Sequence, residues 1–271
     1  MTDVEIDFRK SAQENANEYF KKAKFAKKKV ESAKAQLEKT LDRMKAPAVT
    51  IEKPEYTISK RREKEWYEKF RWEITTEGFL VIGGRDADQN EMIFSKHIEK
   101  DDIVLHADIV GAPLCVIKSD GKKITEMAIR EASELAAAYS SGWKKGLGAV
   151  DVYWITPEQV SKTPESGEYL SKGGFVIRGK KNFTKKVEMK LAIGVKVGET
   201  ASVIAGSVMA VRKQTKYFVT IIPGSVNQFK LAGDVKNKLV EKASSEDRDA
   251  IRRIDITEIQ IFIPAGEGSI V

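Results

Sequence analysis

The stretch RWEITTEGFLVIGG, residues 71–84, decides how the middle of this 271-residue chain folds. Its two apolar runs flank Glu77 and Gly78, and glycine takes the positive φ of a tight turn at little cost. The stretch therefore predicts two antiparallel strands joined by a short turn. Asp86 follows, and its side chain is placed to cap a helix over residues 88–98.

Strands and helices alternate irregularly through the rest of the middle region. Thr125 is placed to cap a helix over 126–143. Three alanines at four-residue spacing give that helix a slim face for packing on a sheet: Ala128, Ala132 and Ala136. Further strands are predicted over 102–109, 112–118, 148–156 and 175–178. Because there is no regular βα repeat, the sequence predicts an α+β fold.

The N-terminal region, residues 8–46, repeats apolar and alanine positions at steps of three and four. This spacing is typical of a coiled-coil seam, and the lysines between the seam positions solvate the outer face. Pro47 and Pro54 end the pattern, and a second, shorter helix is predicted over 59–70. We therefore expect a coiled-coil arm over residues 1–70, which pairs either with the second helix or with another chain.

The C-terminal region is predicted to be a small α+β domain. Its strands are expected over 188–197, 201–213 and 217–224, and the clearest part of its helix over 231–243. The predicted organisation therefore has three parts: the coiled-coil arm, a central mixed α/β domain over 71–186 and this domain over 187–271.

The charge balance favours a polyanionic partner. The chain carries 47 Lys and Arg against 40 Asp and Glu, which gives a formal net charge of +7 and a pI near 9.2. Nucleic acid or an acidic membrane face would match this charge. A need for solubility alone is the alternative explanation.

The few cysteines and histidines argue against a disulfide-bonded protein and against a structural zinc site. Cys115, the only cysteine, lies among apolar neighbours and predicts a buried, reduced thiol with no internal disulfide. With only His97 and His106, neither a structural zinc site nor a cofactor is expected. No apolar run approaches the ~20 residues that span a bilayer, and residues 1–10 lack a signal-peptide pattern. We expect a cytoplasmic protein with no membrane partner.

The segment SKGGFVIRGKKNF, residues 171–183, carries the strongest signal for a binding site. Extended to Lys186, it holds six cationic side chains and no carboxylate. Its glycines let a partner approach the backbone closely. Arg178, Lys180 and Lys181 are therefore predicted to contact RNA phosphates, which release counterions when they bind. A solvated cationic run without a partner is the alternative.

Two other patterns suggest chemistry, each with a plainer alternative. Paired glycines followed by Arg85 are similar to a phosphate-binding turn, although a tight turn before a capped helix explains them too. His106 and Asp108 share one face of a predicted strand and, with Glu168, could serve as a general base. A structural or RNA-contacting histidine is the alternative.

Aromatic and basic side chains mix in residues 152–170. Tyr169 could stack on an exposed base, and Lys162 could meet a phosphate. Tyr153 and Trp154 alternate across a predicted strand, so at least one of them is expected in the core, with Lys162 pointing outward.

Four long segments resemble the RNA-binding R domain of the NFACT family: residues 69–91, 105–118, 136–147 and 152–183. That family includes the nuclear export mediator factor of eukaryotes and bacterial proteins once described as fibronectin-binding. Residues 10–24 are similar to the start of the family's middle coiled-coil segment. The tail after Val187 is more similar to the tails of archaeal members, which favours an archaeal source.

The resemblance implies a non-catalytic, RNA-binding role in ribosome-associated quality control. Members bind a large ribosomal subunit that still carries peptidyl-tRNA, hold tRNA there and promote template-free elongation of the stalled chain. This chain would contact tRNA or rRNA through seven residues: Arg85, His106, Lys162, Tyr169, Arg178, Lys180 and Lys181.

The family's N-terminal domain and helix-hairpin-helix segment have no counterpart in this sequence, so a fragment or a split protein is expected. Its partners would be the large ribosomal subunit, a coiled-coil protein or the family's missing N-terminal half. Two alternatives stay open. One is a nucleic-acid-processing enzyme that uses His106 and Asp108, and the other is a protein-interaction scaffold that binds through its helical seam.

Overall fold

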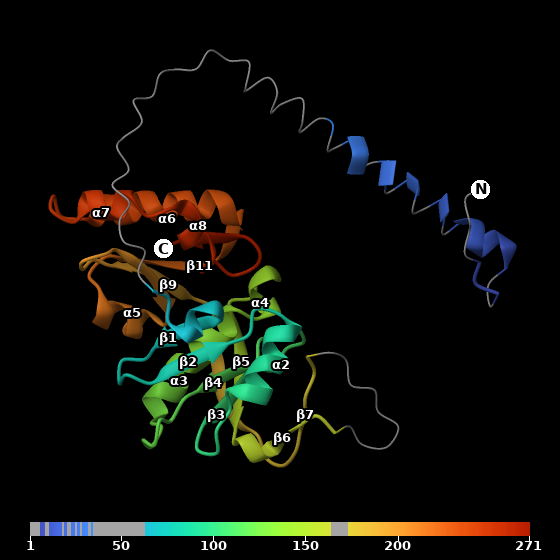
Figure 1. Ribbon diagram of the computed structural model, residues 1–271, viewed down its shortest axis with the longest axis horizontal. Coiled ribbons are helices and arrows are strands. Elements are labelled where there is room, and N and C mark those ends of the chain that lie inside the picture. Colours follow the sequence, from blue (N-terminus) through green and yellow to red (C-terminus); the bar gives the residue numbers. More distant parts are fainter. Residues whose placement is uncertain are drawn as a thin grey trace. The chain divides into compact units, whose positions relative to one another are not determined.

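The computed structural model describes residues 63–163 and 173–271 and parts of the N-terminal region (Figure 1). The described N-terminal residues are 6–8, 11–17, 19–20, 23–24, 26–27, 29–31 and 34. The chain divides into two compact units, Met1–Ile58 and Ser59–Val271. All strands of the described residues lie in the second unit.

In the N-terminal unit, the described residues between 12 and 34 are helical. A capping box begins this helix. The Ser11 hydroxyl accepts from the Glu14 N–H at 3.3 Å, and the Glu14 carboxylate accepts from the Ser11 N–H at 2.8 Å. The seam predicted over 8–46 lies only partly within the described residues, and its pairing stays a prediction.

The α-helix predicted over 59–70 is not found in the described part of that range. That part contains η1, Trp66–Lys69, which is a single 3-10 turn. Tertiary packing explains the difference. The Trp66 ring stacks on His97 with centroids 4.8 Å apart, and Phe70 is fully buried. These contacts override the helical preference of the local sequence.

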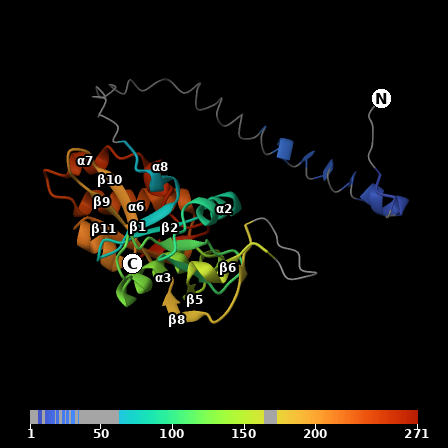
Figure 2. The ribbon, with the colours of Figure 1, turned by 60° about the horizontal axis from the view of Figure 1, so that its bottom comes forward.

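Six antiparallel strands form the first sheet, in the order β1-β2-β4-β3-β5-β8. Their bounds are β1 Arg71–Ile74, β2 Leu80–Gly83, β3 Ile103–Ala107, β4 Cys115–Ile117, β5 Ala149–Ile155 and β8 Asn182–Glu188. The hairpin predicted over 71–84 is confirmed, because Arg71 lies opposite Gly83 and Gly78 makes the turn at a φ of 88°. β8 lies at the edge of the sheet beside β5 (Figure 2).

The helix α3, Glu126–Ala138, covers one face of the first sheet. Its Ala128, Ala132 and Ala136 are fully buried there, as their spacing predicts. The Thr125 hydroxyl accepts from the Ala128 N–H at 3.1 Å, which confirms the predicted cap. The short helix α4, Ser141–Lys144, follows directly.

The helix α2, Ala87–Lys96, covers the opposite face together with a two-stranded ribbon. The Asp86 carboxylate accepts from the Gln89 N–H at 2.8 Å, so the second predicted cap is confirmed too. The ribbon pairs β6, Val160–Ser161, with β7, Val176–Ile177. A short 3-10 turn, η2, Pro157–Gln159, precedes β6.

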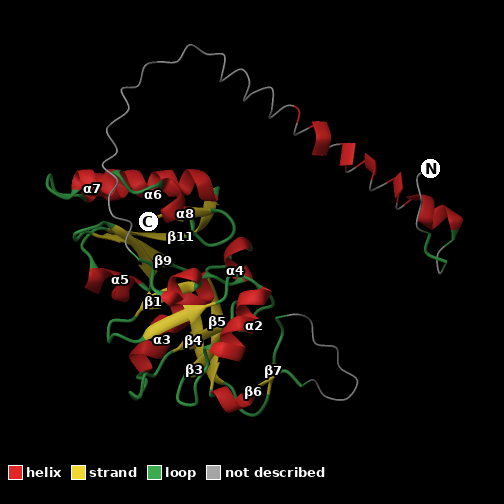
Figure 3. Cartoon of the chain, in the orientation of Figure 1, coloured by secondary structure: helices red, strands yellow, loops and turns green. Residues whose placement is uncertain are grey.

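A second sheet of four antiparallel strands, in the order β10-β9-β11-β12, forms much of the C-terminal region. The elements there are β9 Leu191–Lys196, β10 Ser202–Gly206, α5 Val208–Gln214, β11 Phe218–Val226, α6 Gln228–Lys242, α7 Arg248–Arg252, α8 Ile256–Gln260 and β12 Gly268–Ile270. The predicted helix over 231–243 is confirmed as α6, which packs against β9, β11 and β12 (Figure 3).

The strand predicted over 201–213 is wrong in its second half. Its first half is β10, but the residues after Ser207 form α5. The Ser207 hydroxyl caps this helix by accepting from the Ala210 N–H at 3.2 Å. The Ser207 N–H donates to the buried carboxyl group of Glu73 at 2.7 Å, a tertiary hydrogen bond that the local sequence does not predict.

Helices and antiparallel sheets combine into an α+β fold, as predicted. β8 crosses the predicted boundary at residue 186, and the core under α3 continues into the second sheet through Leu191 and Ile221. The division into domains over 71–186 and 187–271 therefore stays a prediction. Among the described residues, no helix combines the length and apolarity needed to cross a bilayer.

Candidate nucleic-acid interface

Three rings form a row across neighbouring strands of the first sheet. His106 of β3 lies opposite Tyr153 of β5, and Tyr153 lies opposite Phe183 of β8. The ring centroids are 5.7 Å apart for His106 and Tyr153, and 6.1 Å apart for Tyr153 and Phe183. Directly opposed residues project from the same face. These three residues therefore make up an aromatic row that ends at the sheet edge.

Two lysines lie over the aromatic row. The Lys181 ammonium is 4.1 Å from the Tyr153 ring centroid, and the Lys185 ammonium is 4.1 Å from the Phe183 ring centroid. Lys185 also donates to Asp151 Oδ2 at 2.8 Å, and this bond lowers the pKa of the Asp151 carboxyl. Lys181 has no ion-pair partner among the described residues.

The cationic residues that the sequence suggests for RNA binding differ in whether a carboxylate balances their charge. Lys162 is half-buried and forms an ion pair with Glu91 at 2.6 Å. Arg178 reaches a backbone carbonyl at 3.4 Å, and Lys180 is exposed. Neither of them has an ion-pair partner in the part of the chain that the structure describes. We call Arg178, Lys180 and Lys181 the cationic edge, because no described carboxylate balances their charge.

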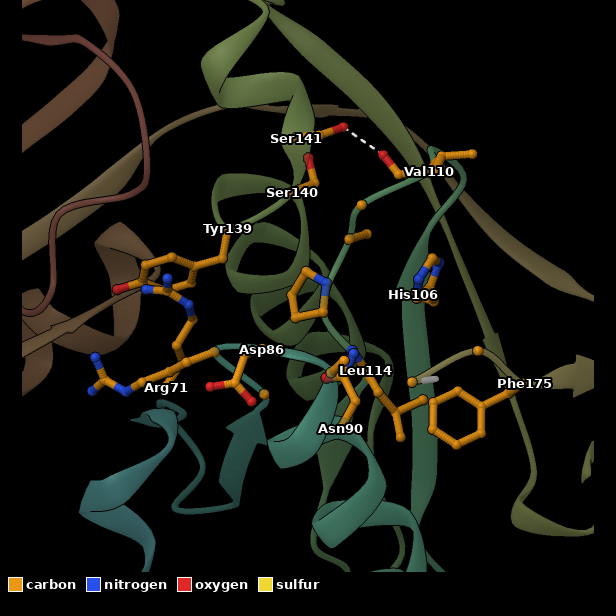
Figure 4. Close-up of a pocket in the computed structure, with 18 of the residues that line it drawn as sticks. Arg71, Asp86, Asn90, His106, Val110, Leu114, Tyr139, Ser140, Ser141 and Phe175 are labelled. Carbon is orange, nitrogen blue, oxygen red and sulfur yellow. Dashed lines mark hydrogen bonds between the residues drawn. The ribbon is translucent and has the colours of Figure 1, made fainter. Parts of the chain in front are cut away.

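A pocket of about 680 Å³ opens beside the aromatic row and shares His106 and Tyr153 with it. Segments far apart in the sequence line it: the turn between β2 and α2, the loop before β4, the junction of α3 and α4, and the residues before β7. Figure 4 shows His106 and Phe175 on one side of the pocket and Arg71 and Tyr139 on the other. The pocket therefore combines an aromatic wall with a cationic one.

His106 is the titratable group on the aromatic side of the pocket. Burial lowers the pKa of its imidazole below the ordinary 6.5, and hydrogen bonding to the backbone at Ala107 and Ala112 only partly opposes this. The ring is therefore neutral at pH 7. Its Nδ1 atom is buried and has no hydrogen-bond partner among the described residues. The Nδ1 atom is therefore left for a hydrogen bond to a ligand.

The sequence around the pocket matches a family profile. The profile of the NFACT protein RNA binding domain covers residues 69–179, which include two rings of the aromatic row and the first residue of the cationic edge. Residues 69–179 are an NFACT protein RNA binding domain. The resemblance carried by the four long segments is therefore confirmed.

Curated relatives share this domain. The archaeal Rqc2 homolog aRqcH of Methanocaldococcus jannaschii is 40% identical over 71% of this chain and 28% of its own length. The ribosome quality control complex subunit NEMF homolog of Drosophila melanogaster is 37% identical over 72% of this chain and 20% of its own length. The human ribosome quality control complex subunit NEMF is 39% identical over 62% of this chain and 16% of its own length. The chain spans less than a third of the length of these relatives.

Within the NFACT RNA binding domain, Arg85 is held by the protein itself. Its guanidinium donates to the carbonyl oxygens of Lys69, Phe70 and Ile261 at 3.1, 3.0 and 3.2 Å. Burial, and then the charge of Arg71, lower the pKa of Arg85. Carbonyl oxygens satisfy the N–H groups but do not neutralise the charge. Arg85 therefore fixes the pocket wall and still contributes positive potential.

The paired glycines before Arg85 form a tight turn whose donors are already used. The Gly84 N–H donates to the Leu114 carbonyl at 3.2 Å, and the Arg85 N–H donates to the Gln89 side chain at 3.1 Å. Asp86 occupies the start of α2 as its cap. The plainer explanation of this sequence, a tight turn before a capped helix, therefore holds.

His106 and Asp108 do not form a hydrogen-bonded dyad in the described part of the NFACT domain. Asp108 is exposed, and no hydrogen bond joins its carboxylate to the imidazole among the described residues. Its backbone N–H donates to the Asp151 carbonyl at 2.8 Å. Glu168 and Tyr169 lie outside the described residues, so the structure gives no position for either.

Tyr153 and Trp154 alternate across β5, as predicted. Tyr153 packs in the core under α2, and Trp154 packs against the core under α3. Cys115 is buried, as expected, and burial raises the pKa of its thiol to about 12.

Phe183, Arg71 and Lys144 are absent from the candidates that the sequence suggests. Phe183 lies inside the cationic segment, but only the strand register reveals that it faces Tyr153. Arg71 and Lys144 are brought to the pocket from distant parts of the chain. No local pattern signals such a meeting.

Proposed function

We propose that this chain is a non-catalytic, RNA-binding component of ribosome quality control that contacts tRNA or rRNA on the large ribosomal subunit. The observation that carries the proposal is the cationic edge, which has no counter-charge among the described residues and borders the aromatic row. Phosphates neutralise such cations and release counterions, and exposed rings stack on bases.

Two paired lysines nearby give a comparison within the same surface. Lys162 and Lys185 have carboxylates at 2.6 and 2.8 Å, from Glu91 and Asp151. The fold therefore neutralises some of its cations here and leaves the cationic edge uncompensated. Because like charges repel, such a cluster is stabilised when an anion binds.

The names of the relatives support a ribosomal setting. They are an archaeal Rqc2 homolog and subunits of the ribosome quality control complex. By analogy, the proposed partner is a large subunit with a stalled peptidyl-tRNA, and the proposed compartment is the cytoplasm. The coiled-coil arm would dock a protein partner or the remaining half of a longer protein. The predicted division at residues 70 and 186 belongs to this proposal.

Replacing Lys180 and Lys181 together by glutamate (K180E/K181E) tests the proposal. We expect the RNA affinity to fall by roughly tenfold or more at low salt, because two phosphate contacts become repulsive. The slope of log Kd against log salt concentration should flatten by about 1.4 to 1.8. Fluorescence anisotropy of a labelled tRNA or rRNA hairpin across a salt series measures both quantities.

The matched control is K122E/K123E, which makes the same change in net charge. Lys122 and Lys123 are exposed and lie in the loop between β4 and α3. Their replacement should leave the salt slope nearly unchanged. Equal losses in both variants would mean that only the total charge matters. Wild-type binding by K180E/K181E would remove the cationic edge from the interface.

The non-catalytic part of the proposal has its own measurement. RNA incubated with the purified chain, with and without Mg²⁺, should keep its full length on a denaturing gel. Cleavage that depends on the protein and disappears in His106→Ala would favour the enzyme alternative instead.

A further inference from the structure

The pocket beside the aromatic row has two kinds of wall. Apolar and aromatic side chains line one part: Val104, Leu114, Tyr153, Ile155, Phe175 and Ile177. Arg71, Arg85 and Lys144 line another part. The volume of about 680 Å³ lies within the range of roughly 300–1,000 Å³ that is usual for small-molecule sites. The pocket therefore has both the size and the mixed character of a ligand site.

Positive charge dominates the pocket. Among its described lining residues, Asp86 is the one carboxylate, and its Oδ1 already accepts from the Gln89 N–H at 2.8 Å. Arg71 and Lys144 have no ion-pair partner in the described part of the chain. This side of the pocket therefore favours an anionic group.

Arg71 is positioned before any ligand arrives. Its guanidinium lies 3.9 Å from the centroid of the Tyr139 ring, and the Tyr139 hydroxyl donates to the Phe262 carbonyl at 2.7 Å. The Nη1 atom of Arg71 is buried and has no acceptor among the described residues. A guanidinium that is fixed in place but incompletely hydrogen-bonded gains stability from an added acceptor.

The opposite side of the pocket suits a nucleobase. His106 is neutral at pH 7 because burial lowers its pKa, and its Nδ1 lacks a partner among the described residues. Phe175 lies on the same side in Figure 4, and Phe94 supports its ring with centroids 5.1 Å apart. Proteins hold unstacked bases against such apolar and aromatic walls and read the base edge by hydrogen bonds.

The cationic edge borders the pocket. Phe175 and Ile177 line the pocket, and Arg178 follows them in the chain. Lys181 covers Tyr153, which is another lining residue. An RNA strand with its phosphates along the cationic edge would therefore bring its next nucleotide to the pocket. This continuity favours a nucleotide carried by RNA over a free one.

We propose that the pocket receives one unpaired nucleotide of the bound RNA, with its base beside His106 and Phe175 and its phosphate near Arg71 and Lys144. The inference rests on the proposed RNA-binding function. It adds a preference for RNA with an unpaired nucleotide, which a cationic edge alone would not give.

The two histidines of the chain provide a site signal and a reference signal. His106 lines the pocket, whereas His97 stacks on Trp66 and does not line it. Ring signals of histidine-labelled full chain can be followed by NMR during titration with three probes. These are an RNA hairpin with an unpaired loop, a blunt duplex with the same stem, and 5′-AMP or 5′-UMP.

The hairpin should shift the His106 signals and leave the His97 signals in place. The duplex should bind through the cationic edge, leave the His97 signals in place and shift the His106 signals much less than the hairpin does, because it only neutralises the nearby Lys181 charge. The mononucleotides should shift His106 only at concentrations about 100-fold above the hairpin, because the RNA chain supplies a high effective concentration. Half-saturation by a mononucleotide at the hairpin's own concentration would identify a free nucleotide as the ligand and overturn the proposal.

Failure of this inference and failure of RNA binding give different results. If the hairpin binds and K180E/K181E weakens it, but the His106 signals stay unmoved, the pocket inference is wrong and the proposed function stands. If none of the RNA probes binds, the proposed function is wrong, and the pocket inference falls with it.

Two neighbouring variants give a second readout. Lys144 lines the pocket, whereas the adjacent Lys145 does not, and both side chains are exposed. K144E should weaken hairpin binding by about tenfold, the size of a lost charged hydrogen bond, and change duplex binding much less. K145E should affect both RNAs equally and weakly. The same loss in K144E and K145E would assign the effect to net charge and overturn the role of the pocket.

Discussion

At the scale of single residues, Phe183 is the most exposed ring of the aromatic row. Its side chain is 40% exposed, whereas Tyr153 is buried beneath the Lys181 ammonium. An incoming base can therefore stack on Phe183 without rearranging the core. Lys185, held by Asp151, keeps a positive charge above the same ring.

Phe183→Ala should weaken RNA binding by roughly fivefold or more, because stacking contributes about 1–3 kcal/mol per base. The free energy of unfolding should change little, since the ring is partly exposed. Phe229→Ala is the matched control, because Phe229 is 64% exposed on α6. Anisotropy titration and urea unfolding separate the two effects. Unchanged RNA affinity in Phe183→Ala would exclude stacking on this ring.

At the scale of elements, structure that depends on neighbouring residues can be predicted from the sequence. The hairpin over 71–84 and the caps Asp86 and Thr125 each depend on residues within one turn of one another. The start of α5 is only partly local: the Ser207 hydroxyl caps the helix at Ala210, but the Ser207 N–H also donates to Glu73, 134 positions away, and no local pattern shows that bond.

The candidate nucleic-acid interface is likewise predictable only where it depends on residues close together in the sequence. The cationic edge is a continuous run and is visible in the sequence, as is the presence of His106. The aromatic row needs the register of three strands, and the cationic wall needs the fold to bring Arg71 and Lys144 to the same pocket. Local spacing carries no information about either arrangement.

Glu73 joins β1 to the start of α5 and makes the stability depend on pH. Burial raises the pKa of its carboxyl well above the ordinary 4.5, and the hydrogen bond from the Ser207 N–H only partly opposes this. The unfolded chain releases the proton near pH 4.5, whereas the folded chain keeps it. The contribution of Glu73 to stability therefore declines as the pH rises from about 4.5 towards the folded pKa.

Glu73→Gln should gain stability relative to the wild type as the pH rises. Glutamine keeps an acceptor for the Ser207 N–H and has no proton to lose. The difference in the free energy of unfolding should be smallest near pH 5 and should grow in favour of the variant at higher pH. Urea unfolding at several pH values measures it, with Glu199→Gln at an exposed position as control. A difference that does not change with pH would contradict this explanation.

At the scale of the whole molecule, the C-terminal region of the unit Ser59–Val271 holds lining residues of the pocket in place by hydrogen bonds. The Ile261 carbonyl accepts from Arg85, the Phe262 carbonyl accepts from Tyr139, and Ala265 lines the pocket. The NFACT profile ends at residue 179, yet residues beyond it hold the cationic wall in place. The proposed binding surface therefore depends on the connection between α8 and β12 as well as on the first sheet.

Ultraviolet crosslinking of the full chain to large ribosomal subunits, followed by mass spectrometry of RNA-linked peptides, tests the central claim most directly. We predict that the peptides containing Phe183 and His106 carry rRNA or tRNA nucleotides, and that K180E/K181E removes these crosslinks. Crosslinks confined to other parts of the chain, or present at wild-type yield in K180E/K181E, would contradict the claim that the uncompensated cationic edge and the aromatic row bind RNA.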